Sequence, residues 1–145
     1  ADVASGDLPL GIQVLDDSAC PSPTDEGRAM MQLITDIAPG ADQAFHTAFS
    51  GQPAFAQGIL DLANAGCNVI VDDVIYFAEP MFQDGIIAQA VDSVVDSGVA
   101  YFSSAGNADR KSYESAFSSS GIEISIGGIP FYLPTLLIYP IQCLL

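Results

Sequence analysis

The chain has 145 residues, half of them apolar, and carries 18 acidic against 3 basic residues, for a formal net charge of -15. This length is one domain's worth with room for a core, and its evenly spread apolar residues exclude extensive disorder. The negative charge argues against nucleic acid and anionic membranes as partners.

Two periodicities alternate along the chain and predict an α/β fold with a mostly parallel sheet. Short apolar runs that end in Asp or Gly indicate strands, and apolar residues that recur every three to four positions indicate helices. Because strand and helix alternate three times, consecutive strands are expected to lie parallel in one sheet. The expected elements are a loop at 1–10, strands at 11–15, 44–48, 69–71 and 99–102, and helices at 25–37, 52–65 and 84–97.

Each expected helix has a recognisable start and an expected buried side. Thr24 or Asp25 is a natural N-cap for the first helix, which puts Glu26 in its first turn, and Pro53 suits the first turn of the second. The positions expected to be buried are Met30, Leu33, Ile34 and Ile37 in the first helix, Phe55, Ile59, Leu62 and Ala63 in the second, and Ile86 or Ile87, Ala90, Val91, Val94 and Val95 in the third.

The pattern loosens after Asn107. One more strand is expected at 122–126, and the last segment, 129–145, is uncharged and contains three prolines. That segment is too short and too broken to span a membrane, and it is predicted to be neither a helix nor a regular strand. The chain therefore divides into an α/β region at 1–128 and an apolar, Pro-containing tail at 129–145, which is either a real tail or a truncated or out-of-frame terminus.

Acidic residues gather at the predicted carboxyl ends of the strands. Asp16-Asp17 and Asp72-Asp73 end two strands, and Asp25-Glu26 opens a helix. Ligands of open parallel sheets bind at that edge, so this convergence indicates a site. The alternative is that these acids only end strands and cap helices.

Residues 99–107 carry a resemblance to a known family. An apolar strand that runs into Ser-Ala-Gly-Asn resembles the subtilisin-like serine peptidases, and segments 36–41, 65–70 and 88–98 resemble the same family in the same order. The resemblance spans residues 10–128. It implies an incomplete three-layer fold, with a mostly parallel sheet flanked by helices, and an extracellular or secreted setting, although the chain shows no signal peptide.

The resemblance also implies roles for individual residues. Asn107 stands where the family's Asn donates a hydrogen bond to the oxyanion, a task that suits a neutral amide. Glu26 stands where subtilases have the general-base His. Sedolisins, a related family, have Glu there, but their Asp one helical turn later is Met30 here, and they carry Asp at the oxyanion position. The stretch Asp73-Val74-Ile75 replaces the family's cleft-lining Ser-Leu-Gly. The alternative role of Glu26 is to stabilise the first turn of its helix.

Two of the family's catalytic residues have no counterpart in this sequence. The catalytic Asp is expected on a strand before the chain begins, and no Gly-Thr-Ser sequence occurs for the nucleophile. The expected function is therefore a fragment of a serine endopeptidase that cleaves polypeptides in its full-length parent and is inactive as this chain alone. The alternative is a catalytically dead, peptidase-like binding module with an acidic rim. A generic α/β domain is a third possibility.

No metal or other cofactor is expected. The alternative is a Ca²⁺ site built from Asp72, Asp73, Glu79 or Asp84, whose hard oxygen ligands suit that ion, although these acids lack a regular ligand spacing. The only histidine, His46, is expected to be a packed or surface residue of a strand rather than the base. Three scattered cysteines form neither a zinc motif nor a disulfide framework, and the oligomeric state is left open.

Overall fold

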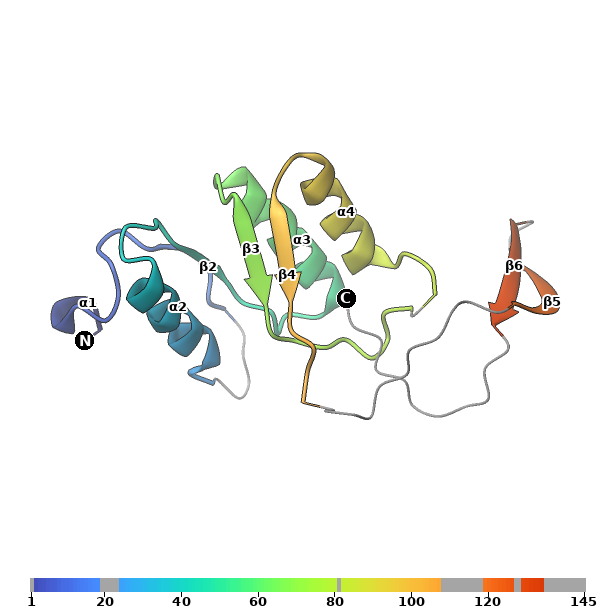
Figure 1. Ribbon diagram of the computed structural model, residues 1–145, viewed down its shortest axis with the longest axis horizontal. Coiled ribbons are helices and arrows are strands. Elements are labelled where there is room, and N and C mark those ends of the chain that lie inside the picture. The colour runs from blue at the N-terminus through green and yellow to red at the C-terminus, as the bar shows by residue number, and fades with distance from the viewer. Residues whose placement is uncertain (1, 19–23, 81, 108–118, 127–128, 135–145) are drawn as a thin grey trace. The chain divides into compact units, whose positions relative to one another are not determined.

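The computed structural model describes residues 2–18, 24–80, 82–107, 119–126 and 129–134 (Figure 1). They form two compact units, one within Ala1–Ser104 and the other within Ala105–Leu144. The first unit contains α1 (Asp2–Ser5), β1 (Gln13–Asp16), α2 (Glu26–Ile37), β2 (Ala44–His46), α3 (Gln52–Asn64), β3 (Val69–Asp72), α4 (Ile86–Asp96) and β4 (Ala100–Ser103). The second contains β5 (Ser119–Ile126) and β6 (Ile129–Pro134).

The predicted order of strands and helices in the first unit is confirmed, and the α/β class with it. β1 pairs in parallel with β2, and β3 pairs in parallel with β4, each pair joined through a helix. In the described residues, however, these are separate two-stranded sheets, so the expected single sheet is not formed there. The loop expected at the N-terminus is also wrong in part, because Asp2–Ser5 is a short helix.

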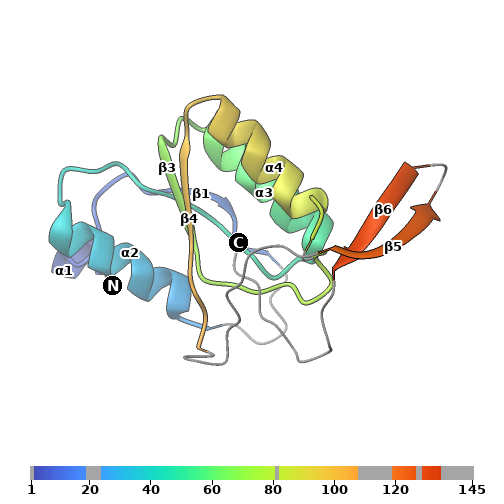
Figure 2. The same cartoon turned by 45° about the vertical axis from the view of Figure 1, so that its right-hand side comes forward.

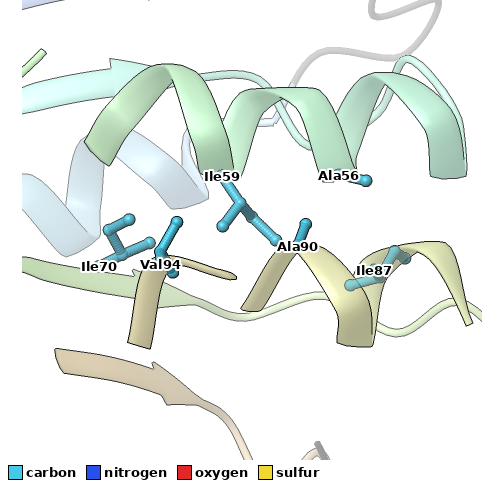
Figure 3. Packing of buried hydrophobic residues seen from close by; sticks show 6 residues of the cluster. All are labelled: Ala56, Ile59, Ile70, Ile87, Ala90 and Val94. Carbon is cyan, nitrogen blue, oxygen red and sulfur yellow. The ribbon is translucent and has the colours of Figure 1, made fainter. Parts of the chain in front are cut away.

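The core of the first unit lies where α3 and α4 pack on one face of the β3–β4 pair. Ile59 of α3 is 2% exposed and points toward Ala90 and Val94 of α4, with Ile70 of β3 beside them (Figure 3). The predicted burial is confirmed for Ile59, Ala90 and Val94, and of the two alternatives in α4 it is Ile87 that is buried. The other predicted positions only pack against this core half-buried, namely Phe55, Leu62, Ala63 and Val91. The prediction is wrong for Val95, which is 48% exposed.

The opposite face of the β3–β4 pair is apolar and exposed. Val69 and Phe102 are each 57% exposed, and Val71 is similar. Figure 2 shows α3 and α4 together on the other side of these strands. The alternation of the strands explains the difference, because residues two apart share a face. Ile70 and Asp72 face the helices, whereas Val69 and Val71 face away.

The helix α2 differs most from its prediction. Of its four positions expected to be buried, Leu33 is 62% and Ile37 is 86% exposed, whereas Met30 and Ile34 are half-buried. The helix contacts β2 through Gly27, where an added Cβ would lie 2.7 Å from Cε2 of Phe45. Local periodicity therefore placed the helix correctly but could not say what covers its apolar side.

The strands described in the second unit form one antiparallel pair. The strand expected at 122–126 is confirmed as part of β5, which pairs antiparallel with β6. The expectation of no regular strand after residue 128 is wrong for Ile129–Pro134. Both strands are edges of a two-stranded sheet, where a proline can occupy positions whose N–H is not needed for pairing. Residues 135–145 of the predicted tail lie outside the described residues.

None of the helices in the described ranges has the length and hydropathy needed to cross a membrane.

Candidate functional site at the ends of β3 and β4

The register of the β3–β4 pair sets the geometry of the candidate site. Ile70 lies opposite Tyr101, and Asp72, the last residue of β3, lies opposite Ser103, the last residue of β4. Because the strands are parallel, the segments that follow both of them leave from the same end of the pair. Ser104 continues the pairing, since its backbone N–H donates to the Asp72 carbonyl at 3.2 Å.

The Asp72 carboxylate is turned toward the helix-covered face and is fully engaged. Its Oδ1 accepts a hydrogen bond from the Ser103 hydroxyl at 2.8 Å and a longer one from the Val74 backbone N–H at 3.4 Å. Its Oδ2 accepts a hydrogen bond from the Tyr101 hydroxyl. The sequence indicated that Asp72 belongs to an open acidic rim. This expectation is wrong for Asp72, because strand alternation points its side chain inward.

Tyr101 is set up as a permanent donor in this cluster. Burial raises the pKa of its hydroxyl, and the hydrogen bond to the Asp72 carboxylate and the negative charge of that group raise it further. The hydroxyl accordingly keeps its proton across the ordinary pH range and donates it to Asp72.

The predicted cleft residues follow β3 directly. Asp73 is exposed, Val74 is half-buried and Ile75 is 50% exposed. In this segment the backbone N–H of Val74 is hydrogen-bonded to the Asp72 side chain. Solvent therefore reaches the side chains of Asp73 and Ile75, which is what contact with a ligand requires.

Asn107 and Glu26, the two predicted catalytic residues, belong to different parts of the chain. Asn107 is exposed, lies just inside the second unit, and follows Gly106, whose φ of 68° is left-handed. Glu26 is the exposed first residue of α2. The structure brings Asp73 and Ser104 to one end of a strand pair, but the described contacts do not join Glu26 to either of them.

The start of α2 is held by neighbours of Glu26. Asp25 occupies the N-cap position, as predicted, but its side chain caps no backbone N–H. Its carboxylate pairs instead with Arg28 at 2.6 Å, and Arg28 also contacts Asp2 at 2.8 Å. This pairing, with the Asp2 hydrogen bond as the largest cause, raises the pKa of the Arg28 guanidinium.

Glu79 has a structural role that the sequence analysis missed. Its Oε1 accepts the backbone N–H groups of Ile87 and Ala88, both at 3.0 Å, and its Oε2 accepts the side-chain amide of Gln52 at 2.9 Å. The carboxylate thus caps α4 and links it to the start of α3. Gly85 is the feature of the sequence that could have indicated this role. As the N-cap residue of α4 it has no side-chain acceptor, so the first N–H groups of the helix need an acceptor from another residue.

His46 is a packed residue at the end of β2, in line with the prediction. Its Nδ1 donates to the Thr47 carbonyl at 2.8 Å, and its ring lies so close to α3 that a Cβ at Gly58 would be 2.6 Å from Nδ1. Asp16, its register partner on β1, accepts the Ser18 N–H at 2.8 Å. Hydrogen bonds from Ser18 are the main cause of a lowered Asp16 pKa, and the charge of His46 lowers it further.

Within the described ranges, no group of three or more His, Cys, Asp or Glu side chains is arranged to hold a metal ion. Of the acids considered for Ca²⁺, Asp72 and Glu79 have their carboxylate oxygens occupied by hydrogen-bond donors of the chain itself. No protein-family model, curated protein or solved structure matches this chain.

Proposed function

We propose that this chain is part of a subtilisin-like serine endopeptidase and supplies part of its peptide-cleaving site. The observation that carries the proposal is the parallel register of β3 and β4, which ends at Asp72 opposite Ser103. It sends the Asp73–Ile75 segment and the chain toward Asn107 out from the same end of one strand–helix–strand unit. That edge is where ligands of parallel α/β units bind.

In this proposal the reaction is amide hydrolysis through an acyl-enzyme. A serine from outside the 145 residues attacks the peptide carbonyl, and the negative charge that develops on its oxygen is stabilised by the Asn107 side-chain amide. Glu26 stands in the position of the group that takes the serine proton and returns it to the leaving amine. A carboxylate suits this task better in acid than at neutral pH.

The family resemblance implies a catalytic Asp on a strand before residue 1, but the chain has a carboxylate of its own at the end of a strand. β1 ends at Asp16, and Asp17 follows it, directly before the segment that leads into α2 and Glu26. Asp16 is committed to Ser18, whereas Asp17 is exposed. In this proposal the exposed Asp17 is the second candidate for the partner of Glu26, beside an Asp outside the 145 residues.

We propose the three-layer fold of this family. We also propose that the full-length protein is secreted from the cell. The exposed apolar face of β3–β4, with Val71 and Phe102, and the exposed apolar side of α2, with Leu33 and Ile37, support the three-layer fold. These are surfaces that a third layer would remove from water, at roughly 25 cal/mol for each Å² buried.

The proposal is tested on the full-length protein with a serine-directed fluorophosphonate and a peptide substrate. We expect covalent labelling, and we expect Asn107→Ala to lower kcat by roughly a hundredfold or more. Asn64→Ala, at the exposed end of α3, is the matched control and should leave kcat unchanged. A folded protein that is neither labelled nor active would refute the peptidase proposal.

The second candidate is a catalytically inactive binding module that recognises basic partners. The net charge of -15 and the exposed carboxylates of Asp17 and Asp73 at strand ends favour it. It predicts binding to a basic peptide that weakens as salt rises, because exposed charges are screened, together with no fluorophosphonate labelling at any pH. Asp73→Asn should weaken such binding.

A further inference from the structure

The side chain of Asp72 joins three segments of the described chain, β3, β4 and the residues that follow β3. It receives hydrogen bonds from two side chains of β4, Tyr101 and Ser103, and from the backbone of the segment that follows β3, at Val74. Tyr101 and Ser103 are two residues apart, so they project from the same face of β4. One carboxylate therefore bridges both strands and the start of the next segment.

A carboxylate on the helix-covered face of β3 costs free energy of desolvation, so the position of Asp72 needs an explanation. Asp72 shares its face with the buried Ile70. Asp72 itself is half-buried, and a carboxylate that is partly removed from water loses hydration that hydrogen bonds must replace. An apolar residue would fill the same position without that requirement. The carboxylate thus needs its donors, and the donors hold the strand ends in one arrangement.

The backbone at this end of the pair is held by two groups of Asp72, its backbone carbonyl and its side-chain carboxylate. The ladder closes with the Ser104 N–H on the Asp72 carbonyl at 3.2 Å, the last bond of an open two-stranded sheet. Beyond it, the Val74 N–H is held by the Asp72 side chain rather than by the ladder. Such terminal bonds fray readily unless side chains fix them.

We propose that Asp72 is a positioning residue, which holds the first residues of two segments, Ser104 after β4 and Val74 after β3, in one fixed arrangement at the end of the strand pair. Its role in catalysis rests on the function proposed above, whereas its hold on the backbone does not. Asp72 touches no reacting atom. Misplacement of a site by about 1 Å can cost roughly a hundredfold in rate, so loss of Asp72 should lower kcat more than it raises KM.

The test uses the full-length protein and three variants. Asp72→Ala removes every side-chain hydrogen bond but keeps the backbone carbonyl that accepts the Ser104 N–H. Asp72→Asn keeps the size and one acceptor oxygen, and Asp92→Asn removes one exposed charge from α4 as a matched control. Two quantities are measured in each: amide hydrogen exchange at Ser104 and Val74, and kcat and KM on a peptide substrate.

We expect Asp72→Ala to speed exchange at Ser104 and Val74 at least tenfold and to lower kcat about tenfold to a hundredfold, with KM changed less than threefold. Asp72→Asn should fall between it and the wild type, and Asp92→Asn should match the wild type. If Asp72→Ala does not fold, Asp72→Asn and Tyr101→Phe, which removes the Oδ2 donor, must show the same changes to a smaller degree.

Unchanged exchange at Ser104 and Val74 in the folded variants would overturn the positioning role altogether. Faster exchange with unchanged kcat would overturn its link to catalysis. A wild type with no activity would refute the peptidase function instead, and the exchange rates would still decide whether Asp72 holds the two segments.

Discussion

The carboxylate of Glu79 accepts the backbone N–H of Ile87 at 3.0 Å, across eight residues of sequence. Gly85, the N-cap residue of α4, has no side chain to perform this task. The two positions are linked, because a Cβ at Gly85 would lie 2.4 Å from Oε1 of Glu79. The start of α4, and with it the packing of α4 on α3, therefore depends on a residue outside the helix.

Replacement of this cap should destabilise the first unit. We expect Glu79→Ala to lower the free energy of unfolding by about 1–2 kcal/mol, because two N–H groups lose their acceptor. Glu79→Gln, which keeps an acceptor oxygen, should lose less. Urea denaturation followed by circular dichroism measures the change. Asp92→Ala, on the exposed side of α4, is the control, and equal losses in the two alanine variants would contradict the capping role.

The contact between Gly58 and His46 gives a second prediction. A methyl group at position 58 would lie 2.6 Å from Nδ1 of the ring, so Gly58→Ala should destabilise the protein by about 1–3 kcal/mol. This is notable because alanine is otherwise the better helix former. Gly40→Ala, with no atom within 4 Å of the new Cβ, is the matched control.

A double variant separates this clash from other effects. His46→Ala removes the ring that the methyl group meets, so Gly58→Ala should cost much less in that background. A thermodynamic cycle over the four proteins gives the coupling between the two positions. Coupling near zero would mean that the ring is not the obstacle.

The Tyr101–Asp72 bond predicts a loss of stability in alkali. The pKa of Tyr101 is raised in the folded protein, so the folded state holds the proton more tightly than the unfolded state does. The resulting contribution of Tyr101 to the free energy of unfolding is fully present below the pKa of about 10 in the unfolded chain. It decreases as the pH rises from that value toward the higher pKa of the folded protein. Unfolding measured between pH 8 and 11 should show a smaller alkaline decrease in Tyr101→Phe than in the wild type. The same decrease in both would disprove the assignment.

The lowered pKa of Asp16 predicts a loss of stability in acid. Its pKa is lowered in the folded protein, first by hydrogen bonds from Ser18. Its contribution is therefore present above its usual pKa of about 3.8 and decreases as the pH falls through the lowered value. A carboxyl NMR titration should give an Asp16 midpoint below 3.8. Ser18→Ala, which keeps the backbone N–H but removes the hydroxyl, should move the midpoint part of the way back. An unmoved midpoint would show that the hydroxyl has no part in it.

The positions of the strands and helices were largely readable from the sequence because they depend on local patterns. The 3.6-residue period of α3 and α4 and the short apolar runs of β3 and β4 identified these elements and the large buried side chains of the two helices, Ile59, Ile87 and Val94, although not Ala56 and Ala88. The same reasoning failed for β6, where prolines argued against a strand. A two-stranded edge tolerates them, but pairing with β5 cannot be read from residues 129–134 alone.

Which face each side chain meets was decided by the tertiary structure. The sequence placed Asp72 and Asp73 together on an acidic rim, but strand alternation and the register with Ser103 turn Asp72 inward and leave Asp73 in solvent. The roles of Glu79 and His46 likewise depend on partners far away in the sequence, at Gln52 and Gly58. Local periodicity specifies where an element lies, whereas a hydrogen bond between distant residues exists only once the chain has brought its donor to its acceptor.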